Sequence, residues 1–264
     1  MKKITKKVVV ITGASSGIGL ETAKFLASKG FVVYGISRRE FASPNFFHYS
    51  CDIKNLNAMC EVLQNIYNRE GQIDVFVNNA GMGLSGAVEY LKANEVENIF
   101  STNVTAPIML CGSVLPYLRQ TKGKIINISS VAAPISIPFQ SCYSATKSAI
   151  EAFSLALSNE VRQMGIKVSC VRPGDTKTGF TQNRVKTEVE NDIYGEKIKK
   201  SVAKMEKDEQ NGKSPLSVAK VVYKICKRKN PPPCVTVGLG YKFLCVLAKF
   251  LPKRLVNYIV GKLY

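Results

Sequence analysis

The chain has 264 residues, 45% of them hydrophobic, which fits an α/β domain with a substantial buried core. It has one histidine and eight cysteines with no Cys-x-x-Cys pair, so we expect no metal site and reduced thiols in the core of a cytoplasmic protein. The net charge of +18 suggests an anionic surface as partner, either a membrane or a nucleic acid, and the alternative is a solvated basic face.

The start of the chain shows no targeting pattern. Residues 1–7 are basic and run directly into an apolar segment that is too short for a signal peptide and is followed by a glycine turn. No stretch reaches the roughly 20 apolar residues that span a bilayer. These features again predict a cytoplasmic protein, with membrane association left to the C-terminal segment described below.

Strand-like and helix-like runs alternate along the chain. Val8-Val9-Val10-Ile11 is a short continuous apolar run, as expected of a parallel strand buried on both faces. The other predicted strands are 31–37, 46–51, 73–78, 124–129, 167–171 and 235–237, and the predicted helices are 17–29, 54–70, about 94–119, 141–164 and 214–229. This order predicts a doubly wound, seven-stranded parallel sheet flanked by helices.

Two segments depart from the alternation. Residues 175–213 are polar with weak helical periodicity, and they are expected to form a lid over the carboxyl edge of the sheet. In residues 241–264, an i, i+4 apolar stripe after Pro252 predicts an amphipathic helical extension. We therefore predict one domain over residues 1–240, including the lid, followed by the extension.

A glycine-rich turn directly follows the first strand. The run Thr12-Gly13-Ala14-Ser15-Ser16-Gly17-Ile18-Gly19 joins that strand to the first helix. Glycines let the backbone approach a pyrophosphate, and the helix N-terminus offers free N–H groups and a positive dipole end. A plain turn is the alternative, but the position between strand and helix favours a dinucleotide phosphate site.

The end of the second strand bears on the choice of dinucleotide. Many NAD sites place an acidic residue there, whereas this chain has Ser37-Arg38-Arg39. Guanidinium groups attract a 2′-phosphate and can bind it bidentately. We expect NADP(H), with NAD(H) less favoured and Arg38 as the main contact. The alternative is that both arginines are solvated turn residues.

Tyr143 and Lys147 stand four residues apart, and Ser130 lies thirteen residues before the tyrosine. In a helix the first two would share one face, with Cβ atoms about 5–6 Å apart. A neighbouring ammonium favours the phenolate, so we expect Lys147 to lower the pKa of Tyr143 from roughly 10. Such a tyrosine can protonate a carbonyl oxygen or deprotonate an alcohol. The same spacing is also common on solvated helices.

Taken in order, these motifs resemble those of the short-chain dehydrogenase/reductase family over about residues 6–240. The matches are the turn at 12–19, Asp52, Asn78-Asn79-Ala80-Gly81, Asn103, Ser130, Tyr143-x-x-x-Lys147, Pro173-Gly174, Thr176 and Thr178. The resemblance implies a Rossmann-like, dinucleotide-binding catalytic domain. It also implies a homodimer or homotetramer, built on the helix that carries Tyr143 and the helix before it.

The resemblance assigns roles to the matching residues. The implied catalytic residues are Asn103 (proton relay), Ser130 (substrate oxygen), Tyr143 (general acid or base) and Lys147 (tyrosine pKa and nicotinamide ribose). The implied cofactor-binding residues are Gly13, Ser15, Ser16, Gly17, Ile18, Gly19, Arg38, Arg39, Asp52, Ile53, Asn79, Ala80, Gly81, Tyr143, Lys147, Pro173, Gly174, Thr176 and Thr178. Ser129 competes with Ser130, but the spacing to Tyr143 favours Ser130. Some relatives carry a basic residue where this chain has Ser16, so phosphate recognition would rest on the two arginines.

The predicted substrate pocket is mostly apolar. Its expected wall is 132–139, with Gly83-Leu84-Ser85-Gly86 and Phe180, and no arginine lies at an obvious carboxylate-binding position near Tyr143. An apolar ketone, aldehyde or alcohol fits this wall: a steroid, a retinoid or a lipid-derived carbonyl. The pattern looks most like the branch of 17β-hydroxysteroid and retinol dehydrogenases and acyl-dihydroxyacetone-phosphate reductases.

Other function classes stay open at this point. They are a 3-oxoacyl carrier-protein reductase, a non-catalytic NADP(H)-binding sensor and a nucleic-acid-binding protein, of which the last two are disfavoured. From Lys213 to Tyr264 the chain is basic and has no Asp or Glu. The lysines that flank its apolar stripe would suit a peripheral contact with a membrane surface. The alternative is that 241–264 packs on the domain or on a second subunit, and we expect no nucleic acid partner.

Overall fold

The structure is a computed structural model that describes residues 6–187 and 193–264. The first five residues, which belong to the predicted non-targeting start, lie outside this range, as do residues 188–192 of the predicted lid.

All seven predicted strands form one parallel sheet in the order β3-β2-β1-β4-β6-β7-β9. The strands are β1 (Val8–Thr12), β2 (Val32–Ser37), β3 (Phe47–Ser50), β4 (Val75–Asn78), β6 (Lys124–Ile128), β7 (Lys167–Arg172) and β9 (Cys234–Thr236). The predicted fold class is confirmed. The strand order reverses between β1 and β4, and at such a switch point the carboxyl ends of the strands open a crevice.

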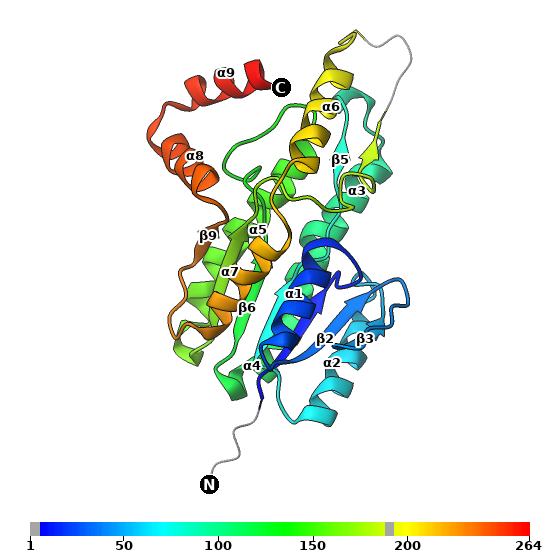
Figure 1. Ribbon diagram of the computed structural model, residues 1–264, viewed down its shortest axis with the longest axis vertical. Coiled ribbons are helices and arrows are strands. Elements are labelled where there is room, and N and C mark those ends of the chain that lie inside the picture. Colours follow the sequence, from blue (N-terminus) through cyan, green and yellow to red (C-terminus); the bar gives the residue numbers. More distant parts are fainter. Residues whose placement is uncertain (1–5, 188–192) are drawn as a thin grey trace.

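Helices cover both faces of the sheet (Figure 1). On one face α1 (Gly17–Ser28) and α7 (Leu216–Lys227) pack on the side chains of Val9 and Ile11. On the other face α2 (Leu56–Glu70), α4 (Ala106–Thr121) and α5 (Ser141–Glu160) pack on Val8 and Val10. Successive side chains of a strand point to opposite faces, so a continuous apolar run such as β1 fills both cores.

The helix predicted at about 94–119 is part of a longer one. It comprises α3 (Ala93–Phe100), a π-helical turn at Ser101–Thr105 (η2) and α4, and among the described residues Ala93–Thr121 is long and apolar enough to cross a bilayer. The expectation that no stretch reaches that length is therefore wrong. Leu110, Val114 and Leu118 pack into the core on one face of the sheet, so part of this apolar surface is used within the fold.

In its described residues, 175–187 and 193–213, the predicted lid contains one helix and one short strand. The helix is α6 (Lys197–Gln210), and β8 (Val185–Lys186) pairs in parallel with β5 (Leu84–Ser85). Two short 3₁₀ turns, η1 (Val88–Tyr90) and η3 (Arg162–Met164), lie between the larger elements.

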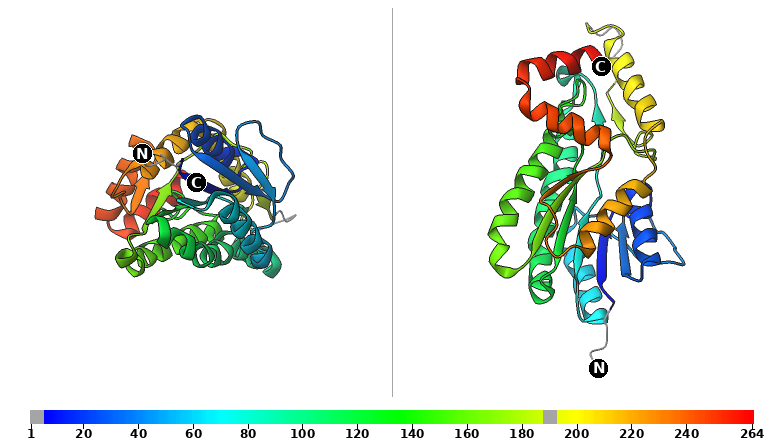
Figure 2. Two further views of the ribbon diagram at one scale, coloured as in Figure 1. Left: turned by 90° about the horizontal axis from the view of Figure 1, so that it is seen from below. Right: turned by 60° about the vertical axis from the view of Figure 1, so that its left-hand side comes forward.

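The C-terminal extension consists of two helices, α8 (Leu239–Phe250) and α9 (Lys253–Leu263), separated at Pro252. They fold back beside α6, at the end of the molecule opposite the N-terminus (Figure 2). The proline cannot donate a helical hydrogen bond and fixes its own φ, so it begins the second helix.

The cysteines are less uniformly internal than expected. All eight lie in the described part of the chain as free thiols, and five of them are buried. Cys60 is exposed on α2, and Cys142 and Cys234 are partly exposed, so the prediction of core thiols is wrong for these three.

Candidate active site

A cavity of about 800 Å³ lies at the carboxyl edge of the sheet and gathers most of the predicted site residues. Predicted residues that line it are Gly13, Ser15, Ser16, Gly17, Ile18, Arg38, Arg39, Asp52, Ile53, Asn79, Ala80, Gly81, Ser130, Tyr143, Lys147, Pro173, Gly174, Thr176 and Thr178. Gly19 and Asn103 stand behind this wall. The cavity lies in the size range of ligand pockets.

The glycine turn has the shape of a backbone cradle. Gly13 has a φ of +69°, and a Cβ there would lie 2.8 Å from the Cα of Ala80. A Cβ on Gly19 would lie 2.2 Å from the carbonyl oxygen of Gly13. Neither position accepts a side chain, so the backbone N–H groups at the start of α1 can approach an anion closely. These residues therefore fit the pyrophosphate of a dinucleotide.

Asn79 holds this cradle in shape. Its Nδ2 donates to the carbonyl oxygen of Thr12 at 2.9 Å, and its own backbone N–H donates to the Thr12 hydroxyl at 3.0 Å. Ala80 N donates to the same hydroxyl at 3.1 Å. Asn79 thus braces the turn through β1, in addition to lining the cavity.

Arg38 and Arg39 lie at the end of β2, exposed and at the rim of the cavity. Their backbone is fixed, because the Ser50 hydroxyl donates to the Arg38 carbonyl at 2.9 Å and the Ser37 hydroxyl donates to the Arg39 carbonyl at 3.1 Å. Among the described residues, neither guanidinium forms an ion pair. Both positive charges are therefore available to an anion in the cavity.

Tyr143 and Lys147 share one face of α5, as predicted. Lys147 is buried, its Nζ lies 5.6 Å from the centroid of the Tyr143 ring, and it donates to the carbonyl oxygen of Ile128 at 3.0 Å. A Cβ on Gly81 would lie 3.1 Å from Asn103 Oδ1 and 3.6 Å from Lys147 Nζ. Because Gly81 has no side chain, its backbone can lie close to both Lys147 and Asn103.

Asn103 belongs to the π-helical turn between α3 and α4. Its Oδ1 accepts from Met82 N at 2.8 Å, and its Nδ2 donates to Met82 O at 2.9 Å. The side chain therefore pairs with the backbone of Met82 as a second strand would. Single π turns inside α-helices are frequent at functional sites, and this one aims Asn103 at the segment that follows β4.

The expected lowering of the Tyr143 pKa by Lys147 is not found. Burial raises the pKa of Tyr143 to about 12, partly opposed by a hydrogen bond with Ser130. Burial likewise lowers the pKa of Lys147 to about 8. Desolvation disfavours the charged form of both groups, and the ammonium lies near the ring and is bonded to a carbonyl. Tyr143 therefore keeps its proton at neutral pH.

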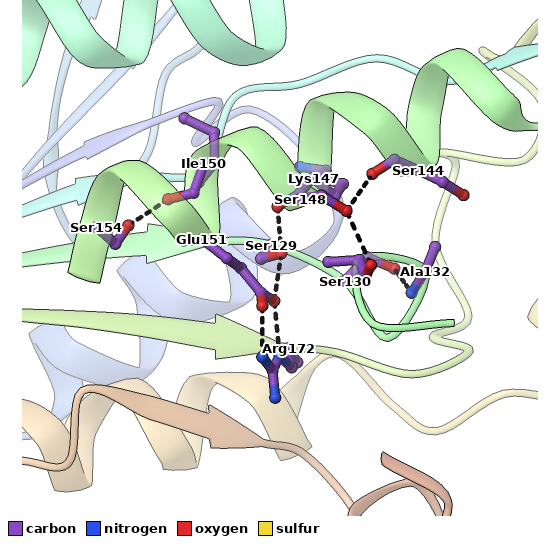
Figure 3. Close-up of polar contacts among 11 residues, drawn as sticks. Ser129, Ser130, Ala132, Ser144, Lys147, Ser148, Ile150, Glu151, Ser154 and Arg172 are labelled. Atoms are coloured by element: carbon purple, nitrogen blue, oxygen red, sulfur yellow. Dashed lines mark hydrogen bonds and ion pairs between the residues drawn. The ribbon is translucent and has the colours of Figure 1, made fainter. Parts of the chain in front are cut away.

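The two candidate serines have different surroundings. Ser129 is buried, and its hydroxyl is within hydrogen-bond distance of the Lys147 carbonyl at 3.1 Å and of Glu151 Oε1 at 2.9 Å. Ser130 Oγ accepts from Ala132 N at 3.1 Å and hydrogen-bonds Tyr143. Ser129 thus bonds within the fold, to Glu151 and to the backbone of α5 (Figure 3). Ser130 is the serine that hydrogen-bonds Tyr143.

An ion pair that sequence reasoning missed supports this arrangement (Figure 3). Arg172 Nε donates to Glu151 Oε1 at 2.6 Å, and an Arg172 terminal nitrogen contacts the other oxygen. Glu151 lies one helical turn after Lys147, and Arg172 directly precedes Pro173. The pair therefore fastens α5 to the end of β7, and no local spacing in the sequence connects its two residues.

Replacing Glu151 by Gln should lower the free energy of unfolding by about 2 kcal/mol, because Arg172 then keeps a mostly buried charge without its partner. Urea unfolding measures this difference. Glu160→Gln is the matched control, since Glu160 is exposed at the end of the same helix. Equal midpoints for the two variants would contradict the role given to the pair.

The predicted apolar wall is only partly correct. Ala132 and Ile137 line the cavity, and the Phe180 ring lies 5.7 Å from the Tyr143 ring. In contrast, Gly83-Leu84-Ser85-Gly86 does not line it, because Leu84 and Ser85 are buried in the pairing of β5 with β8. Val185 and Met205 from the lid complete the apolar wall instead.

The C-terminal extension contributes to the site, which sequence reasoning also missed. Tyr264, the last residue, lines the cavity, and Lys204 Nζ of α6 lies 5.4 Å from its ring. Tyr241 packs on Gly174 so closely that a Cβ there would lie 2.2 Å from the ring, and its hydroxyl donates to Asp175. Nothing local in the sequence indicates either contact, because both depend on how α8 and α9 fold back.

Comparison with known proteins agrees with this geometry. A sequence model of the short chain dehydrogenase family matches residues 7–189. The chain is 39% identical to a 3-ketodihydrosphingosine reductase of Bacteroides thetaiotaomicron over 98% of each chain. It is 35% identical to the 3-oxoacyl-[acyl-carrier-protein] reductase FabG of Buchnera aphidicola over 68% of this chain and 77% of that one. A short-chain dehydrogenase structure from Streptomyces avermitilis has a TM-score of 0.81 at 30% identity, covering 92% of each chain. The chain therefore belongs to the short-chain dehydrogenase family and is an oxidoreductase of carbonyl and alcohol groups.

Proposed function

We propose that the protein uses NADPH to reduce a long-chain 2-amino ketone of the 3-ketodihydrosphingosine type. The observation that carries this proposal is the similarity to the Bacteroides reductase, which covers 98% of this chain and so extends into α8 and α9. The similarity to FabG covers 68% of the chain, and the carrier-protein alternative therefore has weaker support.

The proposed roles follow from the cavity. The turn at 12–19 with Arg38 and Arg39 would hold the dinucleotide, and when bound its nicotinamide supplies the hydride. Tyr143 gives its proton to the substrate carbonyl oxygen while Ser130 hydrogen-bonds that oxygen. The raised pKa of Tyr143 keeps that proton in place at neutral pH, so the protonated phenol that reduction requires is present.

Asp175 supports an ammonium on the substrate. It lines the cavity, forms no ion pair with any described residue, and its charge contributes to the raised pKa of Tyr143. Glu209 also lines the cavity, but it is paired with Arg184. Burial raises the pKa of the Asp175 carboxyl, partly opposed by the charge of Lys204. A carboxylate that forms no ion pair with a described residue and lies near Tyr143 supports a cationic group on the substrate.

The test is NADPH oxidation by the purified protein with 3-ketodihydrosphingosine, an amine-free long-chain ketone, a 3-oxoacyl carrier-protein thioester and a ketosteroid. The amino ketone should give the highest kcat/KM. Asp175→Asn should lower that value about 10–100-fold and leave the amine-free ketone unchanged, because one charge-assisted contact is lost. Tyr241→Phe is the control, since it removes the hydroxyl bound to Asp175 and keeps the carboxylate.

Three results would contradict the proposal. Preference for the thioester would support a carrier-protein reductase, and preference for the ketosteroid would support the steroid branch. NADPH binding without turnover of any substrate would support the sensor alternative.

The predicted homodimer or homotetramer and the cytoplasmic location stay predictions. Met109 on α4 is 48% exposed and Leu155 on α5 is 49% exposed, so both helices present apolar groups where the family resemblance places subunit contacts.

A further inference from the structure

The outer surfaces of α8 and α9 expose many large apolar side chains. We name this surface the tail face; its apolar members are Leu239, Phe243, Leu244, Val246, Leu247, Phe250, Leu255, Tyr258, Ile259 and Leu263. Phe243 is 66% exposed and Phe250 is 82% exposed. Across these two fully described helices, the buried residues are Cys245 and Val260.

An exposed apolar surface of this kind indicates that another molecule binds there. Removing one side chain of this size from water stabilises a complex by about 1.5–3 kcal/mol, and large contiguous apolar surfaces mark interaction sites. The tail face joins ten such groups on two consecutive helices. Its helices use little apolar surface for packing on the domain, so the domain itself is not the partner.

The charges on the tail face identify the kind of partner. The exposed cations Lys242, Lys249, Lys253, Arg254 and Lys262 lie among the apolar groups, and from residue 213 to the C-terminus there is no Asp or Glu. A second copy joined by a two-fold axis would bring two such cationic sets together, and like charges repel. An anionic bilayer accepts both features, since rings enter the headgroup region and cations meet lipid phosphates.

We propose that the tail face docks on an anionic lipid bilayer. Tyr264 directly follows α9 and lines the catalytic cavity, so docking would hold one wall of the cavity next to the lipid. α9 and α6 lie near each other at one end of the molecule (Figures 1 and 2). A membrane-borne substrate would then enter without crossing water. This route rests on the proposed function, whereas the docking does not.

The test is co-sedimentation of the full chain with phosphatidylcholine vesicles, with and without phosphatidylglycerol, in the absence of substrate. The wild-type protein should bind the anionic vesicles. Phe243→Ser with Phe250→Ser should reduce the partition coefficient at least about tenfold, because two deeply inserting rings are lost. Lys249, Lys253 and Arg254 changed together to Gln should reduce binding to anionic vesicles about 100-fold.

Two controls distinguish an effect of the tail face from a general loss of apolar surface or of folding. Val88→Ser with Met164→Ser removes apolar groups that are 66% and 41% exposed but lie off the tail face, and this variant should bind like the wild type. NADPH binding should be equal in all variants, which shows that each is folded.

Two results would overturn the docking. One is wild-type protein that remains in solution with anionic vesicles. The other is a lipid-independent dimer that the Phe243/Phe250 variant dissociates in analytical ultracentrifugation, which would assign the tail face to a second copy. Absence of turnover with vesicle-borne amino ketone, together with intact vesicle binding, would instead count against the proposed function alone.

Discussion

Replacing Tyr143 by Phe is expected to reduce turnover about 10²–10⁴-fold, the usual contribution of a general acid. The ring that packs against Phe180 is retained, so the cavity keeps its shape, and only the proton donor is lost. Cofactor binding should change little, because the glycine turn and Arg38 are untouched. The measurement is NADPH oxidation at saturating ketone, with the NADPH dissociation constant determined by fluorescence.

Tyr117→Phe is the matched control for this experiment. Tyr117 is a partly buried tyrosine on α4 whose hydroxyl donates to Gln64 at 3.0 Å, outside the cavity. This variant should turn over substrate at the wild-type rate. Wild-type turnover by Tyr143→Phe would remove Tyr143 from the proton-transfer role and leave Ser130 or a water molecule as the donor.

Replacing Arg38 by Asp is expected to reverse the proposed preference for NADPH over NADH. At the cavity rim the Arg38 guanidinium forms no ion pair with a described residue. Its loss would remove the proposed charge-assisted contact to the 2′-phosphate, and the new carboxylate would add repulsion. The kcat/KM with NADPH should fall at least about 10–100-fold, while the value with NADH is retained or improved. The ratio of the two values, measured with the same ketone, is the readout.

Two further variants make this result interpretable. Arg39→Asp shows how the recognition is divided between neighbouring arginines, and we expect a smaller shift. Arg119→Asp reverses the charge of an exposed arginine on α4 outside the cavity, and it should leave the ratio unchanged. An unchanged ratio in both Arg38→Asp and Arg39→Asp would show that the 2′-phosphate is not recognised at the end of β2.

Features that are determined by residues close together in the chain could be predicted from the sequence. The strands are continuous apolar runs because a parallel sheet buries both faces, and all seven lie within a few residues of their predicted limits. The turn at 12–19 carries glycine where the backbone needs a positive φ or a close approach, as at Gly13 and Gly19. Tyr143 and Lys147 meet because the helical repeat places i and i+4 together.

Features that depend on distant packing could not be predicted. The pKa of Tyr143 depends on how deeply the lid and Phe180 bury it, and the local lysine suggested the opposite direction. The long helix at Ala93–Thr121 arises because a π turn lets α3 continue into α4. Tyr264 reaches the cavity only through the fold of two helices after Gly238, and no spacing rule connects it to Tyr143.

The contact between Tyr241 and Gly174 bears on how this enzyme can be handled. A basic, apolar C-terminal segment is a natural choice for truncation when a protein is hard to purify. Here a cut before α8 would strip the ring from Gly174, the hydroxyl from Asp175 and the last residue from the cavity wall. A shortened chain could be well behaved in solution and still inactive for reasons unrelated to lipid. Solubility is therefore better sought by changing exposed residues such as Phe250 than by deleting the segment.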